Sequence, residues 1–262
     1  IDIHGGGVDL IFPHHENEIA QSEAYSGKRF AGYWVHNGLV VVDGTKMSKS
    51  LGNFLTVKDA LKSYFPEEIR YAILTHNYGS NIDFSKVLFL NARKRMYYFY
   101  VTLLKIRELI GSVDVGVSIE VPKIIGLERK FIEFMNDNFN TPKVIAELTD
   151  VFRELNQIMH SGKYSLGERK SAFKFFLHVL QPIASVLRLF EEDPTEYLSK
   201  LRERVLKERD LTEHFIKSKL EQYRSAKSVK NYQEADSIKK ELELRGVSVQ
   251  ESPESVGWGI IF

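Results

Sequence analysis

The sequence predicts an α/β segment at the start of the chain, then a mostly helical region, and a small α+β unit at the end. Three observations support this fold class. Two runs of strand type, residues 1–12 and 32–42, lie close together near the start. From about Thr56, apolar residues recur at steps of three and four, as they do on helices. Residues 245–262 then return to a turn and one or two short strand-like runs.

The first segment follows the order strand, helix, strand. Residues 14–27 lie between the two strand-like runs and carry acidic side chains in their first turns. Gly27 stands just past their end, which is typical of a helix terminus. The second run leads into the loop Asp43–Asn53, which holds two lysines and three hydroxyl residues.

A long helix is predicted from an apolar stripe formed by Leu88, Ala92, Met96, Phe99, Leu103, Ile106 and Ile110. Residues 111–126 are rich in Gly, Ser, Val and Pro and are the best candidate linker, with a boundary near Val121. After this linker, Thr141 is expected to cap a helix that has Pro142 at its first position. Further apolar stripes predict a small antiparallel helix bundle.

These signals divide the chain into four predicted parts. The α/β segment covers residues 1–57, and connecting helices cover residues 58–121. The helix bundle covers residues 122–195, and the small C-terminal unit covers residues 196–262.

Composition limits the classes of function. Lys and Arg total 36 against 35 Asp and Glu, so a nucleic-acid partner would have to meet local basic surface. No apolar run approaches the ~20 residues of a membrane span, so we expect no membrane partner and a cytoplasmic location. There is no cysteine, and the chain starts at Ile1, directly in a glycine-rich strand. We therefore expect a piece of a longer protein.

The loop after the second strand has a distinctive composition. Lys46 and Lys49, between flexible glycines, suit a loop that closes over a polyphosphate and stabilises charge on a leaving group. For two lysines at this spacing alone, a solvated hairpin turn at Asp43 and Gly44 is the commoner explanation. The complete pentapeptide Lys46, Met47, Ser48, Lys49, Ser50 matches the KMSKS signature of class I aminoacyl-tRNA synthetases without a departure.

A second candidate site lies in residues 2–24. The glycine run 5–7 lets backbone approach a ligand closely, and Asp9 offers a carboxylate for sugar hydroxyls, although such runs are more often turns. His14 and Glu18 are four residues apart, so on a helix both could reach one metal ion. A surface pair is the commoner explanation for this spacing, and the neighbouring His15 and Glu16 would point elsewhere.

The two stretches together resemble the cysteinyl-tRNA synthetase family. Segments similar to that family occur in its order and spacing at residues 4–24, 33–53, 139–142 and 231–250. The resemblance covers essentially the whole chain and is strongest over residues 1–55. It implies that the first part is the C-terminal part of a Rossmann-type catalytic domain, that the connecting helices are of the stem-contact type, and that the last part is an anticodon-binding unit.

The resemblance also implies roles for individual residues. His14 and Glu18 fall where the family holds a zinc ion, which binds the thiolate of the substrate cysteine and so could reject serine without editing. His4, Gly7 and Asp9 fall in the pocket for the aminoacyl-adenylate and its ATP precursor.

The lysines of the signature are the catalytic residues that the resemblance implies. Lys49 would contact the phosphates of ATP, which enters with Mg as a substrate, and Lys46 would stabilise the pyrophosphate side together with it. No general base is obvious in the sequence.

Two departures from the family pattern limit what this chain can do alone. The family has two zinc-binding cysteines and an HIGH signature upstream of the glycine run, and this chain contains neither. We therefore expect half of the catalytic domain, which would not retain zinc and would be inactive alone. Trp258 is followed by Gly259 where the family tends to have arginine, which leaves the anticodon contacts open.

The C-terminal part has a basic stretch between residues 217 and 230. Its cations are Lys217, Lys219, Arg224, Lys227 and Lys230, with only Glu221 as an opposing charge within that stretch. Tyr223 and Tyr232 lie beside it. A solvated helix face and an RNA-backbone contact are both compatible with this pattern, and the resemblance favours RNA, with Trp258 available to stack on a base.

The resemblance implies a cysteinyl-tRNA synthetase. Such an enzyme activates cysteine with ATP to cysteinyl-adenylate and transfers the cysteinyl group to the 3′-terminal ribose of tRNA(Cys). We expect a monomer. One alternative is an ATP-dependent ligase that couples cysteine to an amino-sugar compound, but such an enzyme does not require the C-terminal part. The other is that this chain is only an RNA-binding piece without activity.

Overall fold

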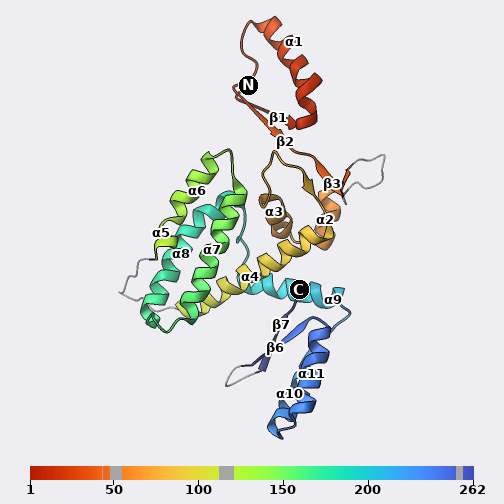
Figure 1. Cartoon of the computed structure of the whole chain (residues 1–262), viewed down its shortest axis with the longest axis vertical. Helices are drawn as coiled ribbons and strands as arrows, with labels where there is room; N and C mark the ends of the chain where they lie inside the picture. The colour runs from red at the N-terminus through yellow and green to blue at the C-terminus, as the bar shows by residue number, and fades with distance from the viewer. Residues whose placement is uncertain (43, 48–54, 112–120, 252–255) are drawn as a thin grey trace. The chain divides into compact units, whose positions relative to one another are not determined.

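The computed structural model describes residues 1–42, 44–47, 55–111, 121–251 and 256–262. They form two compact units, Ile1–Glu191 and Glu192–Phe262, which are coloured from red to cyan and from cyan to blue in Figure 1. None of the helices within these residues has both the length and the apolar character to cross a membrane.

The first unit begins with the predicted strand, helix and strand. Strand β1 (Ile3–Gly7) pairs in parallel with β2 (Tyr33–Asn37), and α1 (Glu16–Ser26) lies between them in the chain. Two short helical turns, η1 (Val8–Leu10) and η2 (Ile11–His15), lead into α1. Gly27 ends α1 in the left-handed conformation, with φ of 65°, so the predicted terminus is confirmed.

A small second sheet follows. Strand β3 (Val40–Val42) pairs antiparallel with β4 (Thr45–Lys46) and parallel with β5 (Ile82–Asp83). Gly38 makes the entry into β3 possible, because a Cβ atom there would lie 2.2 Å from the carbonyl oxygen of Ser80. The chain from β2 into β3 therefore runs directly against the loop before β5.

Three helices connect this sheet to the bundle: α2 (Val57–Ser63), α3 (Pro66–Leu74) and α4 (Lys86–Ile110). The predicted apolar stripe is confirmed on α4, where Met96, Phe99 and Ile106 are fully buried. Helix α4 packs against α3 near its start and against α7 and α8 further along (Figure 1).

The bundle consists of α5 (Pro122–Ile125), α6 (Leu127–Asn136), α7 (Thr141–His160) and α8 (Leu166–Leu187). Helix α5 shows that the end of the predicted linker 111–126 is helical. The predicted cap of α7 is wrong by one residue, because the Asn140 side chain, not Thr141, accepts the Lys143 N–H. Phe152 and Phe176 are fully buried in the bundle core.

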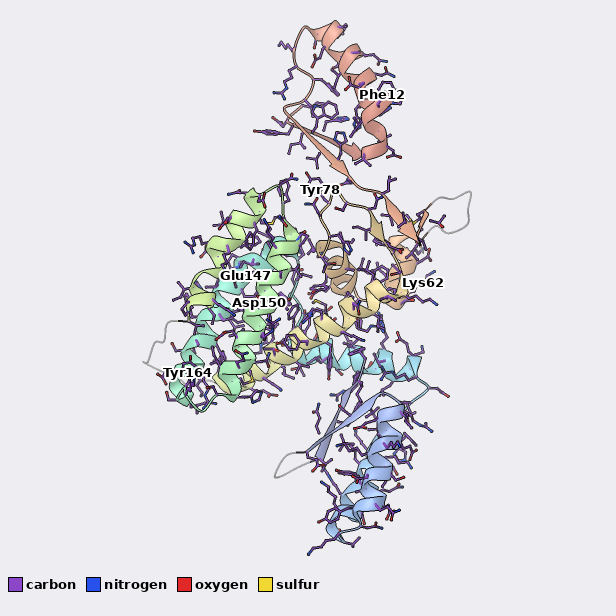
Figure 2. All side chains as sticks on the ribbon, in the orientation of Figure 1. Phe12, Lys62, Tyr78, Glu147, Asp150 and Tyr164 are labelled. Carbon is purple, nitrogen blue, oxygen red and sulfur yellow. The ribbon has the colours of Figure 1, made fainter. Side chains whose placement is uncertain are left out.

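Two polar contacts tie the connecting helices to the bundle. The Glu67 carboxylate, buried at the start of α3, accepts hydrogen bonds from the Tyr100 hydroxyl at 2.9 Å and from the N–H groups of Phe190 and Glu191 at 3.0 and 2.9 Å. Tyr78, labelled in Figure 2, donates its hydroxyl to Asn138 at 2.7 Å. The bonds to Glu67 hold residues 190–191, which follow the bundle, against the start of α3. The bond from Tyr78 holds the loop before β5 against the residues that follow α6.

The second unit is the predicted α+β unit. It contains α9 (Pro194–Glu208), α10 (Glu213–Ser228), α11 (Tyr232–Leu244), and the antiparallel strands β6 (Val247–Glu251) and β7 (Val256–Ile260). Its core is formed by Ile216, Leu220, Tyr223, Leu242 and Val247, among other buried residues.

Candidate active site

A cluster of histidines lies on one face of the β1–β2 pair. The parallel register places His4 beside Trp34 and Gly6 beside His36. Because side chains alternate along a strand, His4 and Gly6 share a face, as do Trp34 and His36. The ring of His15, from the turn before α1, occupies the space over Gly6, where a Cβ atom would lie 2.8 Å from its Cε1. The glycine run thus gives room to an imidazole.

The imidazoles are joined in pairs. His15 Nδ1 lies 2.8 Å from His36 Nε2, within hydrogen-bond distance. The rings of His4 and His15 meet edge to face with centroids 5.0 Å apart, and the Trp34 ring stacks on His36 at 6.0 Å. Burial lowers the pKa of His15, and the neighbouring His36 and His4 lower it further. His15 is therefore held neutral, with a ring nitrogen able to accept a hydrogen bond or bind a metal.

Glu18, on α1, is the only carboxylate of the cluster among the described residues. Its Oε2 lies 2.9 Å from His4 Nε2, and its Oε1 lies 3.7 Å from His14 Nε2. Oε2 is buried and forms no hydrogen bond of good geometry despite that short approach. A carboxylate placed in this way among imidazole nitrogens can offer either of its oxygens to a metal ion.

The structure therefore offers two overlapping ligand sets. Ligand atoms of His4, His15 and Glu18 all lie within 4.8 Å of one another. The predicted pair, His14 and Glu18, is also close, but the His14 side chain is 60% exposed. Nitrogen and carboxylate oxygen ligands of this kind suit zinc. The expectation that His15 points elsewhere is wrong, because it is buried in the cluster.

Two of the three predicted adenylate residues, Gly7 and Asp9, lie at the C-terminal end of β1, and the third, His4, lies near its start. Gly7 is the last residue of the strand, and Asp9 follows in η1 as an exposed residue whose carboxylate lies directly over Gly7. His4 is half-buried and faces Glu18. The structure thus brings His4 to the histidine cluster, while Asp9 stays at the surface next to it.

The KMSKS stretch is described only at its start. Lys46 pairs through its backbone with Val41 in the β3–β4 hairpin, and Met47 is half-buried, with its sulfur 3.4 Å from the Leu55 nitrogen. Ser48, Lys49 and Ser50 lie outside the described residues, so the roles of both lysines stay predictions. The β3–β4 hairpin, whose second strand includes Lys46, turns at Gly44, where φ is 75°.

In the second unit, three of the five cations of the basic stretch pair with acidic residues that lie outside residues 217–230. Lys217 pairs with Glu213 at 3.0 Å, Lys219 with Glu241 at 2.7 Å, and Lys227 with Glu251 at 2.6 Å. The ring of Trp258 also has a partner, because the Arg202 guanidinium lies over it, 4.5 Å from the ring centroid. An RNA contact here stays a prediction.

Comparison with known proteins extends along the whole chain. Residues 1–94 match the family described as the tRNA synthetases class I (C) catalytic domain, and residues 130–191 match the DALR domain. A cysteine–tRNA ligase from Syntrophotalea carbinolica is 40% identical over 98% of this chain, and one from Oleidesulfovibrio alaskensis is 36% identical over 99%. These alignments cover 53% and 55% of those proteins, so the chain spans about half their length.

Solved structures give the same fold. LeuRS of Agrobacterium radiobacter K84, in a ternary complex with tRNA and LeuAMS, superposes on 71% of this chain with a TM-score of 0.52 and 18% identity. Mycobacterium tuberculosis methionyl-tRNA synthetase with methionyl-adenylate also covers 71%, with a TM-score of 0.52 and 15% identity. The alignments cover 26% and 41% of those chains.

The parallel β1–β2 pair, the connecting helices and these matches define a class I aminoacyl-tRNA synthetase fold, with a bundle and a small α+β unit. Within that class, the chain belongs to the cysteine–tRNA ligase family and corresponds to a C-terminal portion of it.

Proposed function

We propose that the complete protein is a cysteine–tRNA ligase, which forms cysteinyl-adenylate from cysteine and ATP and transfers the cysteinyl group to the 3′-terminal ribose of tRNA(Cys). The observation that carries this proposal is the identity of 34–40% to cysteine–tRNA ligases over 98–99% of the chain. A cytoplasmic, monomeric enzyme is part of the same proposal.

The histidine cluster is the proposed amino-acid pocket. His14 and Glu18 would hold zinc, together with ligands from the other half of the catalytic domain, and zinc would supply a soft Lewis acid for the substrate thiolate. His4, 2.9 Å from Glu18 Oε2, would fix the carboxylate so that its other oxygen faces His14. The ring of His15 packs edge to face against His4 and would hold it in place, and His36 would in turn fix His15 through the contact between their ring nitrogens.

The proposed ATP-binding residues are Asp9, Gly7 and the two lysines of the KMSKS signature. Asp9 stands exposed at the end of β1, where it could accept hydrogen bonds from ribose hydroxyls. Lys46 and Lys49 would neutralise charge that develops on the pyrophosphate leaving group of ATP and Mg.

We expect Lys49→Ala in the complete enzyme to slow adenylate formation, with a loss of roughly 2–4 kcal/mol of transition-state stabilisation, because a positioned charge on the leaving group is removed. The measurement is cysteine-dependent exchange of labelled pyrophosphate into ATP. Lys58→Ala, which removes an exposed lysine on α2 outside the signature, is the matched control. Exchange at the wild-type rate in Lys49→Ala would remove this residue from the mechanism.

The function is tested by the RNA preference of this chain. We expect the purified chain to bind tRNA(Cys) more tightly than an unrelated tRNA, and the difference to survive moderate salt, because identity contacts are less salt-dependent than backbone contacts. Filter binding across a salt series measures both affinities. Equal binding that salt abolishes for both tRNAs would contradict the proposal and favour the amino-sugar ligase.

A further inference from the structure

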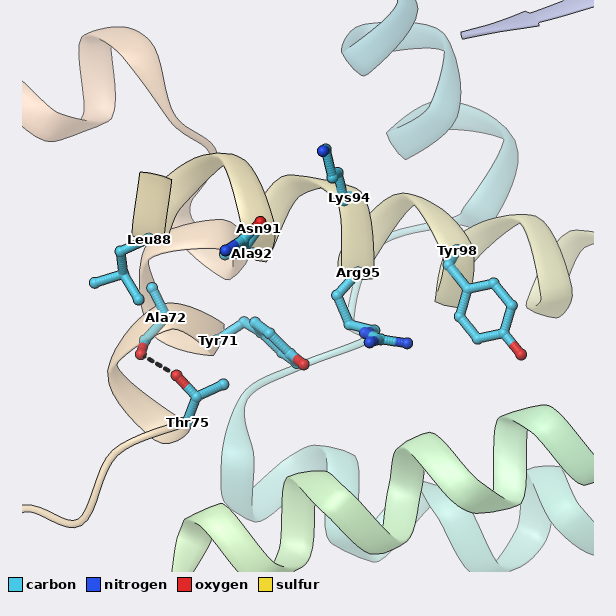
Figure 3. Close-up of a pocket in the computed structure, with 9 residues that line it drawn as sticks. All are labelled: Tyr71, Ala72, Thr75, Leu88, Asn91, Ala92, Lys94, Arg95 and Tyr98. Carbon is cyan, nitrogen blue, oxygen red and sulfur yellow. Dashed lines mark hydrogen bonds between the residues drawn. The ribbon is translucent and has the colours of Figure 1, made fainter. Parts of the chain in front are cut away.

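The linking loop, residues 76–81 between α3 and β5, contacts both the bundle and the hairpin that leads into the KMSKS stretch. It begins where Thr75 ends α3. The Thr75 hydroxyl donates to the Ala72 carbonyl oxygen at 2.7 Å, which closes the last turn of α3 on itself (Figure 3). Because α3 also packs against α4, the linking loop starts from a fixed point.

On one side, the linking loop is bonded to the start of β3. The Gly38 N–H donates to the Tyr78 carbonyl oxygen at 2.8 Å. The Leu39 N–H donates to the Asn81 side-chain oxygen, also at 2.8 Å. The two segments touch without a gap, because Gly38 has no room for a Cβ atom beside the Ser80 carbonyl oxygen. A displacement of the loop therefore displaces the start of β3.

Strand β3 extends this connection to the KMSKS stretch. On one edge, the Val41 carbonyl oxygen accepts the Phe84 N–H at 2.9 Å, next to β5. On the other edge, the Val40 carbonyl oxygen accepts the Met47 N–H at 3.1 Å, and Val41 pairs with Lys46. The first two residues of the signature are thus bonded to the strand that the linking loop holds.

On its other side, the linking loop contacts the α6–α7 corner, residues 137–140. The Tyr78 hydroxyl donates to Asn138 Oδ1 at 2.7 Å. The Tyr78 ring also meets the Phe139 ring edge to face, with centroids 6.3 Å apart. Tyr78 is therefore bonded to the start of β3 through its backbone and to the bundle through its side chain.

The α6–α7 corner holds a costly backbone conformation where it meets Tyr78. Asn138 and Phe139 have φ of 54° and 53°, which is uncommon for asparagine and rare for a bulky residue. Bonds that do not involve Tyr78 keep this shape. The Phe139 N–H donates to the Met135 carbonyl oxygen at 3.1 Å, and the Asn140 N–H to that of Phe134 at 2.9 Å. Such conformations cluster at functional sites, and here one presents a fixed acceptor to Tyr78.

We propose that Tyr78 is a positioning residue for adenylate formation, which holds the KMSKS hairpin in place relative to the α6–α7 corner. It acts through β3 and not by contact with a substrate. The catalytic role rests on the proposed function, whereas the link is a property of this chain. A cation that stabilises a leaving group acts only when it is well placed, so loss of the link lowers the rate of adenylate formation and not the affinity for cysteine.

The link is tested on this chain by hydrogen exchange of backbone amides. Tyr78→Phe keeps the ring and removes only the hydroxyl. We expect it to speed exchange of the Gly38 and Met47 amides about fivefold, as for the loss of one hydrogen bond. Tyr25→Phe, on α1, is the matched control, because this tyrosine is 95% exposed, and it should leave exchange unchanged. Wild-type exchange in Tyr78→Phe overturns the link.

Two variants of Asn138 test the acceptor. Asn138→Gly removes the acceptor and suits the positive φ, so it should match Tyr78→Phe, and the double variant should exchange no faster than either. Asn138→Asp keeps an oxygen acceptor and also tolerates positive φ, so it should retain wild-type exchange. Additive effects of Tyr78→Phe and Asn138→Gly show that the two side chains act separately, which overturns the proposal.

The positioning role is tested in the complete enzyme by cysteine-dependent pyrophosphate exchange. We expect Tyr78→Phe to lower kcat about tenfold with the KM for cysteine unchanged, and Asn138→Asp to retain the wild-type rate. In a Lys49→Ala background, Tyr78→Phe should cost less than about threefold, because a cation that it positions is already absent. A full tenfold loss in that background indicates general damage to the fold and overturns the positioning role.

The two proposals fail in different ways. If Lys49→Ala exchanges pyrophosphate at the wild-type rate, the proposed role of the signature fails, but amide exchange in this chain still decides whether Tyr78 links the bundle to the hairpin. If amide exchange responds to Tyr78→Phe and kcat does not, the link is structural only, and the positioning role is overturned.

Discussion

Replacing Arg93 with methionine is expected to destabilise the first unit by about 3–5 kcal/mol, because it leaves a buried carboxylate without its cation. Arg93 Nε lies 3.0 Å from Glu68 Oε1, and the side chains are 7% and 0% exposed. The second carboxylate oxygen of Glu68 accepts the Phe65 N–H at 2.9 Å, and Arg93 also donates to the Ser63 carbonyl at 2.8 Å. The pair therefore joins the turn between α2 and α3 to the middle of α4.

The measurement is urea unfolding followed by circular dichroism. Arg153→Met is the matched control, because it breaks an ion pair with Asp150 whose side chains are 60% and 48% exposed, and it should cost less than about 1 kcal/mol. The double variant Arg93→Met with Glu68→Gln should recover much of the loss, because the remaining amide oxygen still accepts the Phe65 N–H without a buried charge. A loss in Arg93→Met no larger than in the control would contradict this account.

Much of the fold could be predicted because its signals are local. The stripe on α4 and the end of α1 at Gly27 depend on residues within a few positions of one another, and both are confirmed. The cap of α7 was misplaced by one residue. Asn140 and Thr141 are both good capping residues, and only the backbone decides which of them has the non-helical conformation.

The candidate site was only partly predictable, because it depends on register between segments far apart in the chain. His14 and Glu18 are visible as a spacing of four residues. His36 becomes part of the cluster only because β2 pairs in parallel with β1, which puts it opposite Gly6. Two signals in the sequence could have indicated this pairing. His36 follows Trp34 by two residues on a predicted strand, and Gly6 follows His4 by two residues.

The charge of the basic stretch in the second unit could not be predicted from its own residues either. Within residues 217–230 the sequence contains one acidic residue, which suggested free cations. In the structure, acidic partners come from outside that stretch: Glu213 one turn earlier, Glu241 on α11 and Glu251 on β6. Charge counted along the chain therefore overstates the basic surface of a folded unit. On α4, Arg93 is likewise paired with Glu68, a residue far from it in the chain.

Glu18→Gln in the complete enzyme is expected to lose most of its zinc and to lower cysteine-dependent pyrophosphate exchange by at least about 100-fold. A carboxylate that binds a metal directly contributes a negative charge as well as a ligand atom. The amide of glutamine is neutral, and its oxygen is a weaker ligand. The measurements are zinc content of the purified protein and the exchange rate. Glu16→Gln, an exposed neighbour on the same helix, is the matched control and should leave both unchanged.

The histidine variants then decide which ligand set Glu18 serves. If His14 is the ligand, His14→Ala should lose zinc as Glu18→Gln does, whereas His15→Ala should weaken zinc only about tenfold, as expected for a residue that orients the site. The 2.9 Å approach of His4 Nε2 to Glu18 Oε2 favours this division, because it leaves Oε1 facing His14. Loss of zinc in His15→Ala with retention in His14→Ala would assign the metal instead to His4, His15 and Glu18, the three residues that the fold gathers within 4.8 Å.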